Sequence, residues 1–236
     1  MLAGFIDTLA GGGGLITLPT LLAAGLPPIL ALGTNKVQAA AGTATATLMM
    51  LKSRRIHWSD IRSLMLMSFL GATVGALLVQ LFDTGLLSFI IPLVLLGIAL
   101  YFLFYPLITT RLDRVKISPS GFRNVVVPGI GFYDGMFGPG TGSFFSVAGM
   151  HARGLDLING TALAKSLNFA SNIAALLVFV VLGKVVWILA LTMVAGQLIG
   201  AWLGSHCLIR INAQILRVVV VLVCVAGLIR FALTSW

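Results

Sequence analysis

The chain has 236 residues, of which 59% are apolar and 9% are charged, and its mean hydropathy is +1.09. Soluble proteins have about 45–50% apolar and about 25% charged residues, and a chain of this length cannot enclose so much apolar material in one core. The composition excludes a soluble globular protein, a disordered chain and a disulfide scaffold. The net charge of +9 lies in short gaps between apolar runs, as in membrane proteins rather than nucleic-acid-binding proteins.

A helix that spans a membrane needs about 20 apolar residues. Apolar stretches close to this length recur along the chain. In chain order they are residues 1–10, 37–51 with an extension back through 29–32, 63–82, 84–110, 122–137, 166–183, 185–205 and 211–236. We expect helices, because barrel strands are about ten residues long and alternate in polarity. The sequence therefore predicts an all-α polytopic membrane protein.

Basic residues concentrate in two of the gaps, at 52–62 and 111–123. Cytoplasmic loops of membrane proteins are enriched in Lys and Arg, so we expect both gaps on the cytoplasmic side. Two apolar stretches separate these gaps, which places the short gap at 83–84 outside.

The two halves of the sequence resemble each other. The matching positions, in order, are a Gly-Phe-x-Asp motif at 4–7 and 131–134, a glycine loop at 11–14 and 138–142, Lys36 and Lys165, and Trp58 and Trp187. From Gly25 onward the spacing is constant at 129 residues, and chance would not align both Asp, both Lys and both Trp in order. We predict a first transmembrane repeat at 1–110, a basic cytoplasmic linker at 111–123 and a second repeat at 124–236, with about four helices in each repeat.

The relative orientation of the halves depends on one gap. The basic gap at 52–62 aligns with the gap at 183–184, and if both are cytoplasmic, the halves have parallel topology; inverted topology is the alternative. Residue 1 aligns with residue 128, although the apolar sequence of the second half already begins at 122. We therefore expect the N-terminal helix to be truncated.

Both glycine loops interrupt apolar runs, and a short apolar segment follows each of them. A helix broken in lipid must turn its free N–H and C=O groups toward protein or water, which predicts glycine-broken helices around a binding cavity at the repeat interface. The N-terminus of the second half-helix offers N–H donors and a positive dipole to an anion. The candidate binding residues here are Gly11, Gly12, Gly13, Gly14, Thr17, Gly138, Gly140, Thr141, Gly142 and Ser143.

The alternative for these loops is that glycine only permits close helix packing. Close packing is the role we expect for the glycines spaced by four, which are Gly71, Gly75, Gly196, Gly200 and Gly204.

Lys36 and Lys165 occupy matching positions before uncharged spans. We interpret them as two cations that bracket a central cavity, because an ionisable residue at membrane depth is a functional candidate; a lysine snorkelling at a helix end is the alternative. The neighbouring side chains that would orient the substrate are Thr34, Asn35, Gln38, Asn168, Ser171 and Asn172. Asp7 and Asp134 are candidates for proton coupling or for neutralising the lysines when substrate is absent, with a purely structural pairing as the alternative.

The sequence contains no motif for catalysis or for metal binding. The cysteines, at 207 and 224, and the histidines, at 57, 151 and 206, are isolated and lack metal-ligand spacing. No nucleophile with a base is apparent, so we expect no enzyme, no metal site and no cofactor.

The paired motifs are GFID at 4–7 leading into the glycines at 11–14, TNK at 34–36, GFYDG at 131–135, GPGTG at 138–142 and AK at 164–165. With these motifs the chain resembles, over nearly its whole length, the sulfite exporter TauE/SafE family of bacterial membrane permeases. The resemblance implies a multi-pass permease of the cytoplasmic membrane, built as two repeats, that exports sulfite, sulfoacetate or related sulfur-containing anions. The chain departs from the family at its start, where members have a complete first helix.

We therefore expect a secondary transporter for a small anion: sulfite, a sulfonate or a related sulfur-containing anion. A passive anion channel would use the same residues, and a membrane subunit of a larger complex is a further alternative. The expected partners are the anionic substrate and the lipid bilayer of the bacterial cytoplasmic membrane, without nucleic acid. The oligomeric state stays open, with a homodimer among the options.

Overall fold

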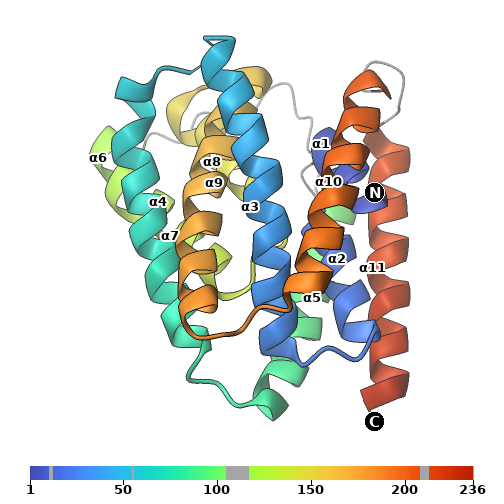
Figure 1. Cartoon of the computed structure of the whole chain (residues 1–236). Coiled ribbons are helices and arrows are strands. Elements are labelled where there is room, and N and C mark those ends of the chain that lie inside the picture. The colour runs from blue at the N-terminus through green and yellow to red at the C-terminus, as the bar shows by residue number, and fades with distance from the viewer. Residues whose placement is uncertain (11–12, 55, 105–116, 208–212, 236) are drawn as a thin grey trace.

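The computed structural model describes residues 1–10, 13–54, 56–104, 117–207 and 213–235, which form helices joined by short turns, with no strand among them (Figure 1). The helices are α1 (Leu2–Ala10), α2 (Gly14–Ala23), α3 (Pro28–Lys52), α4 (Trp58–Val79), α5 (Thr84–Phe104), α6 (Pro119–Gly121), the π-helix η1 (Phe122–Val126), α7 (Val127–Met136), α8 (Thr141–Arg153), α9 (Leu157–Val181), α10 (Trp187–Cys207) and α11 (Ala213–Ser235). The predicted all-α fold is confirmed. Gly11, Gly12 and residues 111–116 of the predicted linker lie outside the described residues.

Within the described ranges, three helices are long and apolar enough to cross a membrane: Trp58–Val79, Thr84–Tyr101 and Ile158–Val181. Shorter apolar helices cover Gly14–Ala23, Trp187–Leu203 and Val221–Leu233. Large apolar side chains such as Leu93, Ile188 and Leu222 are exposed, which suits contact with lipid rather than water. The protein is therefore an all-α membrane protein.

Local sequence sets several of the helix ends. Pro28 begins α3. Proline lacks an N–H group, and at this position the loss costs no hydrogen bond, because the first N–H groups of a helix have no partner within it. The carboxylate of Asp156 caps α9 by accepting from the amide of Asn159 at 2.8 Å. Gly154 ends α8 with a φ of +63°, a left-handed conformation that glycine adopts without strain.

The central helices α3 and α9 run in opposite directions (Figure 1). The amide of Val186, five residues beyond the end of α9, donates to the hydroxyl of Thr34 in the second turn of α3, at 3.0 Å. The basic gap that follows α3 and the gap at 183–184 therefore lie at opposite ends of the molecule. This differs from the parallel topology, which required both gaps on one side, and corresponds to the inverted alternative. The matching sequence could not reveal it, since aligned residues are the same in either topology.

Helices from the two predicted repeats are interleaved. α4 packs along α7, α10 packs along α1, and α3 packs along α9. Gly71 of α4 faces the backbone carbonyl of Pro128, and Gly200 of α10 faces that of Met1, so closely that a Cβ at either glycine would collide with the carbonyl. These contacts confirm the close-packing role predicted for the two glycines.

Each short helix next to a glycine break folds back on its neighbour. The start of α2 lies beside α1, because the amide of Gly13 donates to the carboxylate of Asp7 at 3.3 Å and a Cβ on Gly13 would lie 3.1 Å from the carbonyl of Ala3. Likewise, the end of α8 lies beside the start of the α6–α7 segment, since the guanidinium of Arg153 sits 5.7 Å from the ring centroid of Phe122. Both pairs are helical hairpins, and neither α2 nor α8 is long enough to cross a membrane by itself.

Candidate functional site

The two glycine breaks meet at the centre of the molecule. A Cβ on Gly14, at the start of α2, would lie 3.2 Å from the Cα of Pro139, in the turn before α8. A cavity of about 40 Å³ lies at this junction. It is lined by Asp7, Gly13, Gly14, Asn35, Gln38, Ala39, Thr43, Gly138, Gly140, Thr141, Gly142, Asn168, Asn172 and Gln197. By the same measure one water needs about 10–15 Å³, so the cavity has room for about three water-sized groups.

The helix N-termini are directed at this cavity. Gly14 of α2 and Thr141 and Gly142 of α8 belong to first helical turns, where backbone N–H groups lack partners within the helix. The turn before α8 needs glycine, since Gly138 and Gly140 have φ values of +98° and +82°. Two N-termini with positive dipole ends that face one small cavity form an arrangement suited to an anion.

Lys36 makes a fully buried ion pair with Asp134. Its Nζ lies 2.9 Å from Oδ1 of Asp134, both side chains are 1% exposed, and Nζ also donates to the carbonyl of Asp134 and, at 3.2 Å, to Oδ1 of Asn172. The second carboxylate oxygen of Asp134, Oδ2, is buried and has no hydrogen-bond partner among the described residues. Lys36 is the ninth residue of α3, about 12 Å from its start at 1.5 Å per residue, so it does not lie at a helix end.

Lys165 and Asp7 form a looser counterpart. Nζ of Lys165 lies 3.9 Å from Oδ2 of Asp7 and donates to the Asp7 carbonyl at 3.3 Å, and the side chains are 13% and 23% exposed. Asp7 also accepts from the side-chain amide of Gln197 at 3.2 Å, and Gln197 in turn accepts from Gln38 at 2.7 Å. Each lysine therefore pairs with the aspartate of the opposite half of the chain.

The structure brings many of the predicted residues together and leaves others aside. Those that line the cavity are Gly13, Gly14, Asn35, Gln38, Gly138, Gly140, Thr141, Gly142, Asn168, Asn172 and Asp7. Those that do not line it are Thr17, Thr34, Lys36, Asp134, Ser143, Lys165 and Ser171. Thr17 donates instead to Oδ1 of Asn35 at 2.6 Å and supports that lining residue from behind. Ser171 donates to backbone carbonyls of its own helix.

The two lysines flank the cavity rather than line it. Both lysines are held by aspartates just outside the lining, so the cavity presents backbone amides, side-chain amides, hydroxyls and the carboxylate of Asp7. Among the described residues, no group of three His, Cys, Asp or Glu side chains is placed to hold a metal ion.

Three lining residues were missed by the sequence reasoning: Ala39, Thr43 and Gln197. Ala39 and Thr43 follow Asn35 at four and eight positions, which is one face of a helix, so helical periodicity applied to α3 would have found them. Gln197 is a buried amide in an otherwise apolar stretch, and such a polar side chain at membrane depth was itself a signal.

Comparisons with known proteins find one family model and several relatives that match most of the chain. The family model described as "Sulfite exporter TauE/SafE" matches residues 1–231. The chain is 41% identical over 220 residues to the "Probable membrane transporter protein" of Haemophilus influenzae, covering 93% of this chain and 86% of the relative. It is 42% identical over 229 residues to "Probable membrane transporter protein ORF9" of Sinorhizobium sp (97% and 88%) and 41% identical over 223 residues to "Probable membrane transporter protein YfcA" of Escherichia coli K12 (94% and 83%). No solved structure matches the chain.

Proposed function

The chain belongs to the sulfite exporter TauE/SafE family of membrane transporters, and from this membership we propose that it is a secondary transporter for sulfite, a sulfonate or a related sulfur-containing anion in the bacterial cytoplasmic membrane. The observation that carries the proposal is the meeting of two glycine-broken helical hairpins at one polar cavity. Discontinuous helices whose N-termini face a central cavity are a recurrent way in which transporters bind anionic groups.

The oxyanion would be held by neutral donors first. The backbone amides of Gly14 and Gly142 and the side-chain amides of Asn35 and Asn168 surround the cavity, whereas the hydroxyl of Thr141 already donates to the carbonyl of Gly138 at 2.7 Å. Such donors suit a small oxyanion because they can be directed at several oxygens at once, without a bulky side chain between them.

The lysines would supply charge only when their aspartates release them. An anion that enters the cavity is repelled by Asp7 and attracted by Lys165, which lies 3.9 Å from that carboxylate. Protonation of an aspartate removes the repulsion and leaves its lysine for the anion. Transport of the anion would thereby be coupled to a proton at Asp7 or Asp134, and the unpartnered Oδ2 of Asp134 is a place for that proton.

The interleaving of the two halves favours a carrier over a passive channel. The cavity of about 40 Å³ is lined by helices from both halves, so movement of one half against the other changes access to it. The inverted course of α3 and α9 is the arrangement in which rocking of one half against the other exposes a central site to alternate sides. We propose that the protein has no catalytic activity, because its relatives are named as transporters.

The test is anion counterflow in proteoliposomes. Vesicles loaded with unlabelled sulfite, sulfate, taurine or lactate are diluted into labelled sulfite, and the labelled sulfite that accumulates is followed over time. A carrier for sulfite gives saturable uptake that rises with internal sulfite. Uptake that neither saturates nor responds to internal sulfite would identify a channel. Uptake with none of the loads would remove sulfite as the substrate.

A further inference from the structure

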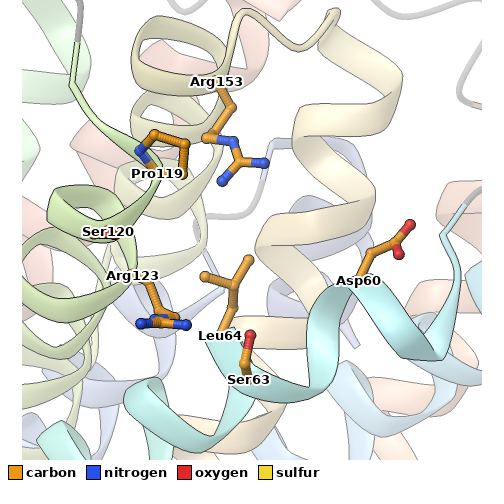
Figure 2. Close-up of a pocket in the computed structure, with 7 residues that line it drawn as sticks. All are labelled: Asp60, Ser63, Leu64, Pro119, Ser120, Arg123 and Arg153. Carbon is orange, nitrogen blue, oxygen red and sulfur yellow. The ribbon is translucent and has the colours of Figure 1, made fainter.

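A second polar pocket lies between α4, the α6–η1 segment and α8 (Figure 2). Because Asp60 belongs to the first turn of α4, the pocket is at the end of the molecule that carries the basic gap after α3. Its volume is about 180 Å³, and it shares no lining residue with the central cavity. The residues that line it are Asp60, Ser63, Leu64, Pro119, Ser120, Arg123 and Arg153.

Two arginines give this pocket its charge. Arg123 comes from η1 and Arg153 from the last turn of α8, and both guanidinium groups extend into the space between the helices (Figure 2). The ion pairs among the described residues involve only lysines. No carboxylate of those residues therefore lies within 4.0 Å of either guanidinium group. Asp60 also lines the pocket, and its carboxylate accepts from the hydroxyl of Ser59 at 2.9 Å.

Both arginines are held in place by neutral neighbours. The guanidinium of Arg153 lies over the ring of the buried Phe122, and Nε of Arg123 donates to Oδ1 of Asn124 at 2.9 Å. These contacts leave the terminal N–H groups directed at the pocket, beside the hydroxyls of Ser63 and Ser120. Planar guanidinium groups bind phosphate oxygens in pairs, so the pocket fits a phosphate group.

The surroundings indicate where that phosphate comes from. Trp58, 58% exposed at the start of α4, is typical of the headgroup level of a membrane. Leu66 and Val125, which are 54% and 70% exposed, lie two residues, about half a turn, beyond the lining residues Leu64 and Arg123, where acyl chains would cover them. We propose that the pocket binds the phosphate of an anionic phospholipid headgroup from the leaflet on the basic side of the protein.

The test is native mass spectrometry of the purified protein titrated with dioleoyl-phosphatidylglycerol. The pocket variant is Arg123→Gln with Arg153→Gln. The matched control, Lys52→Gln with Arg62→Gln, removes the same charge from exposed residues at the same end. A second pocket variant, with both arginines replaced by lysine, keeps the charge and loses the paired geometry. Helical content by circular dichroism verifies that each variant is folded.

We expect the dissociation constant of one bound lipid to rise about tenfold or more in the glutamine pocket variant, and to stay within about twofold in the control. The lysine variant should fall between them. Equal binding by the pocket variant and the wild type would overturn the proposal. Displacement of the lipid by millimolar inorganic phosphate would overturn it too, because the pocket would then be a site for free oxyanions.

Discussion

Lys36 is a charged side chain that is 1% exposed at the depth of the membrane interior, and Asp134 is what makes its burial tolerable. A buried pair adds little stability over an apolar one, whereas removal of one partner leaves an uncompensated charge. The pair lies beside the cavity and joins the two halves of the chain, so we expect its role to be in function rather than in stability.

This reasoning predicts a double-mutant cycle with strong coupling. Lys36→Met alone and Asp134→Asn alone should each lower the free energy of unfolding, with about 3–5 kcal/mol lost when the full charge of the partner remains. The combined variant should recover much of that loss. Unfolding in mixed SDS micelles measures all four proteins. Additive losses would mean that the two side chains do not interact.

The second ion pair should behave differently. Lys165 is 3.9 Å from its partner carboxylate and partly exposed, and Asp7 keeps hydrogen bonds from Gly13 and Gln197 without it. We expect Lys165→Met to cost only about 1 kcal/mol in the same assay. A loss as large as that of Lys36→Met would show that the two pairs are equally buried in the membrane.

At the scale of the elements, the turn before α8 depends most directly on the amino-acid sequence, because its left-handed positions require glycine. Gly140 has a φ of +82° next to the cavity, and Gly25 has a φ of +83° with no atom within 4 Å of its would-be Cβ. Alanine at either position should strain the backbone to a similar extent, by about 1–2 kcal/mol. Only Gly140→Ala also moves the first turn of α8 at the cavity.

We therefore expect Gly140→Ala to abolish sulfite counterflow and Gly25→Ala to leave it within about twofold of wild type at equal reconstituted protein. Loss of counterflow in both variants would assign the effect to general backbone strain and would remove the special role of this turn.

Helix contacts give a prediction about stability alone. Gly71 packs against the carbonyl of Pro128, whereas Gly97 of α5 has no neighbour within 4 Å of its would-be Cβ. Gly71→Ala should cost about 1–3 kcal/mol through overpacking, while Gly97→Ala should be neutral or slightly stabilising. Equal effects in the micelle unfolding assay would contradict the α4–α7 contact.

The sequence was sufficient for the helices and for the glycine breaks, because both follow from composition and position along the chain. It was insufficient for the pairing of Lys36 with Asp134 and of Lys165 with Asp7, since these contacts depend on how the halves cross. Ser171 shows the same limit: its place in the sequence is beside Asn172, but the helix turns its hydroxyl onto its own backbone.

On the scale of the whole molecule, the direction of the halves was the part that sequence could not decide. The contact of Thr34 with Val186 places the start of α3 beside the end of α9. In a membrane, this puts Lys52 and Lys184 on opposite sides.

Cysteine labelling tests that arrangement. In a background with Cys207 and Cys224 replaced by Ala, Lys52→Cys should react with an impermeant maleimide only from the cytoplasmic side, and Lys184→Cys only from the outside. Labelling of both positions from one side would restore the parallel topology.

The central claim is that the anion is bound where the two hairpins meet, with the lysines as its source of positive charge. It is tested most directly by labelled sulfite counterflow with two charge-neutral variants, Lys36→Gln with Asp134→Asn and Lys165→Gln with Asp7→Asn. Lys52→Gln with Asp60→Asn, which replaces one exposed lysine and one exposed aspartate, is the charge-neutral control. We predict that both cavity variants lose counterflow while the control keeps it. Wild-type counterflow in both cavity variants would contradict the account.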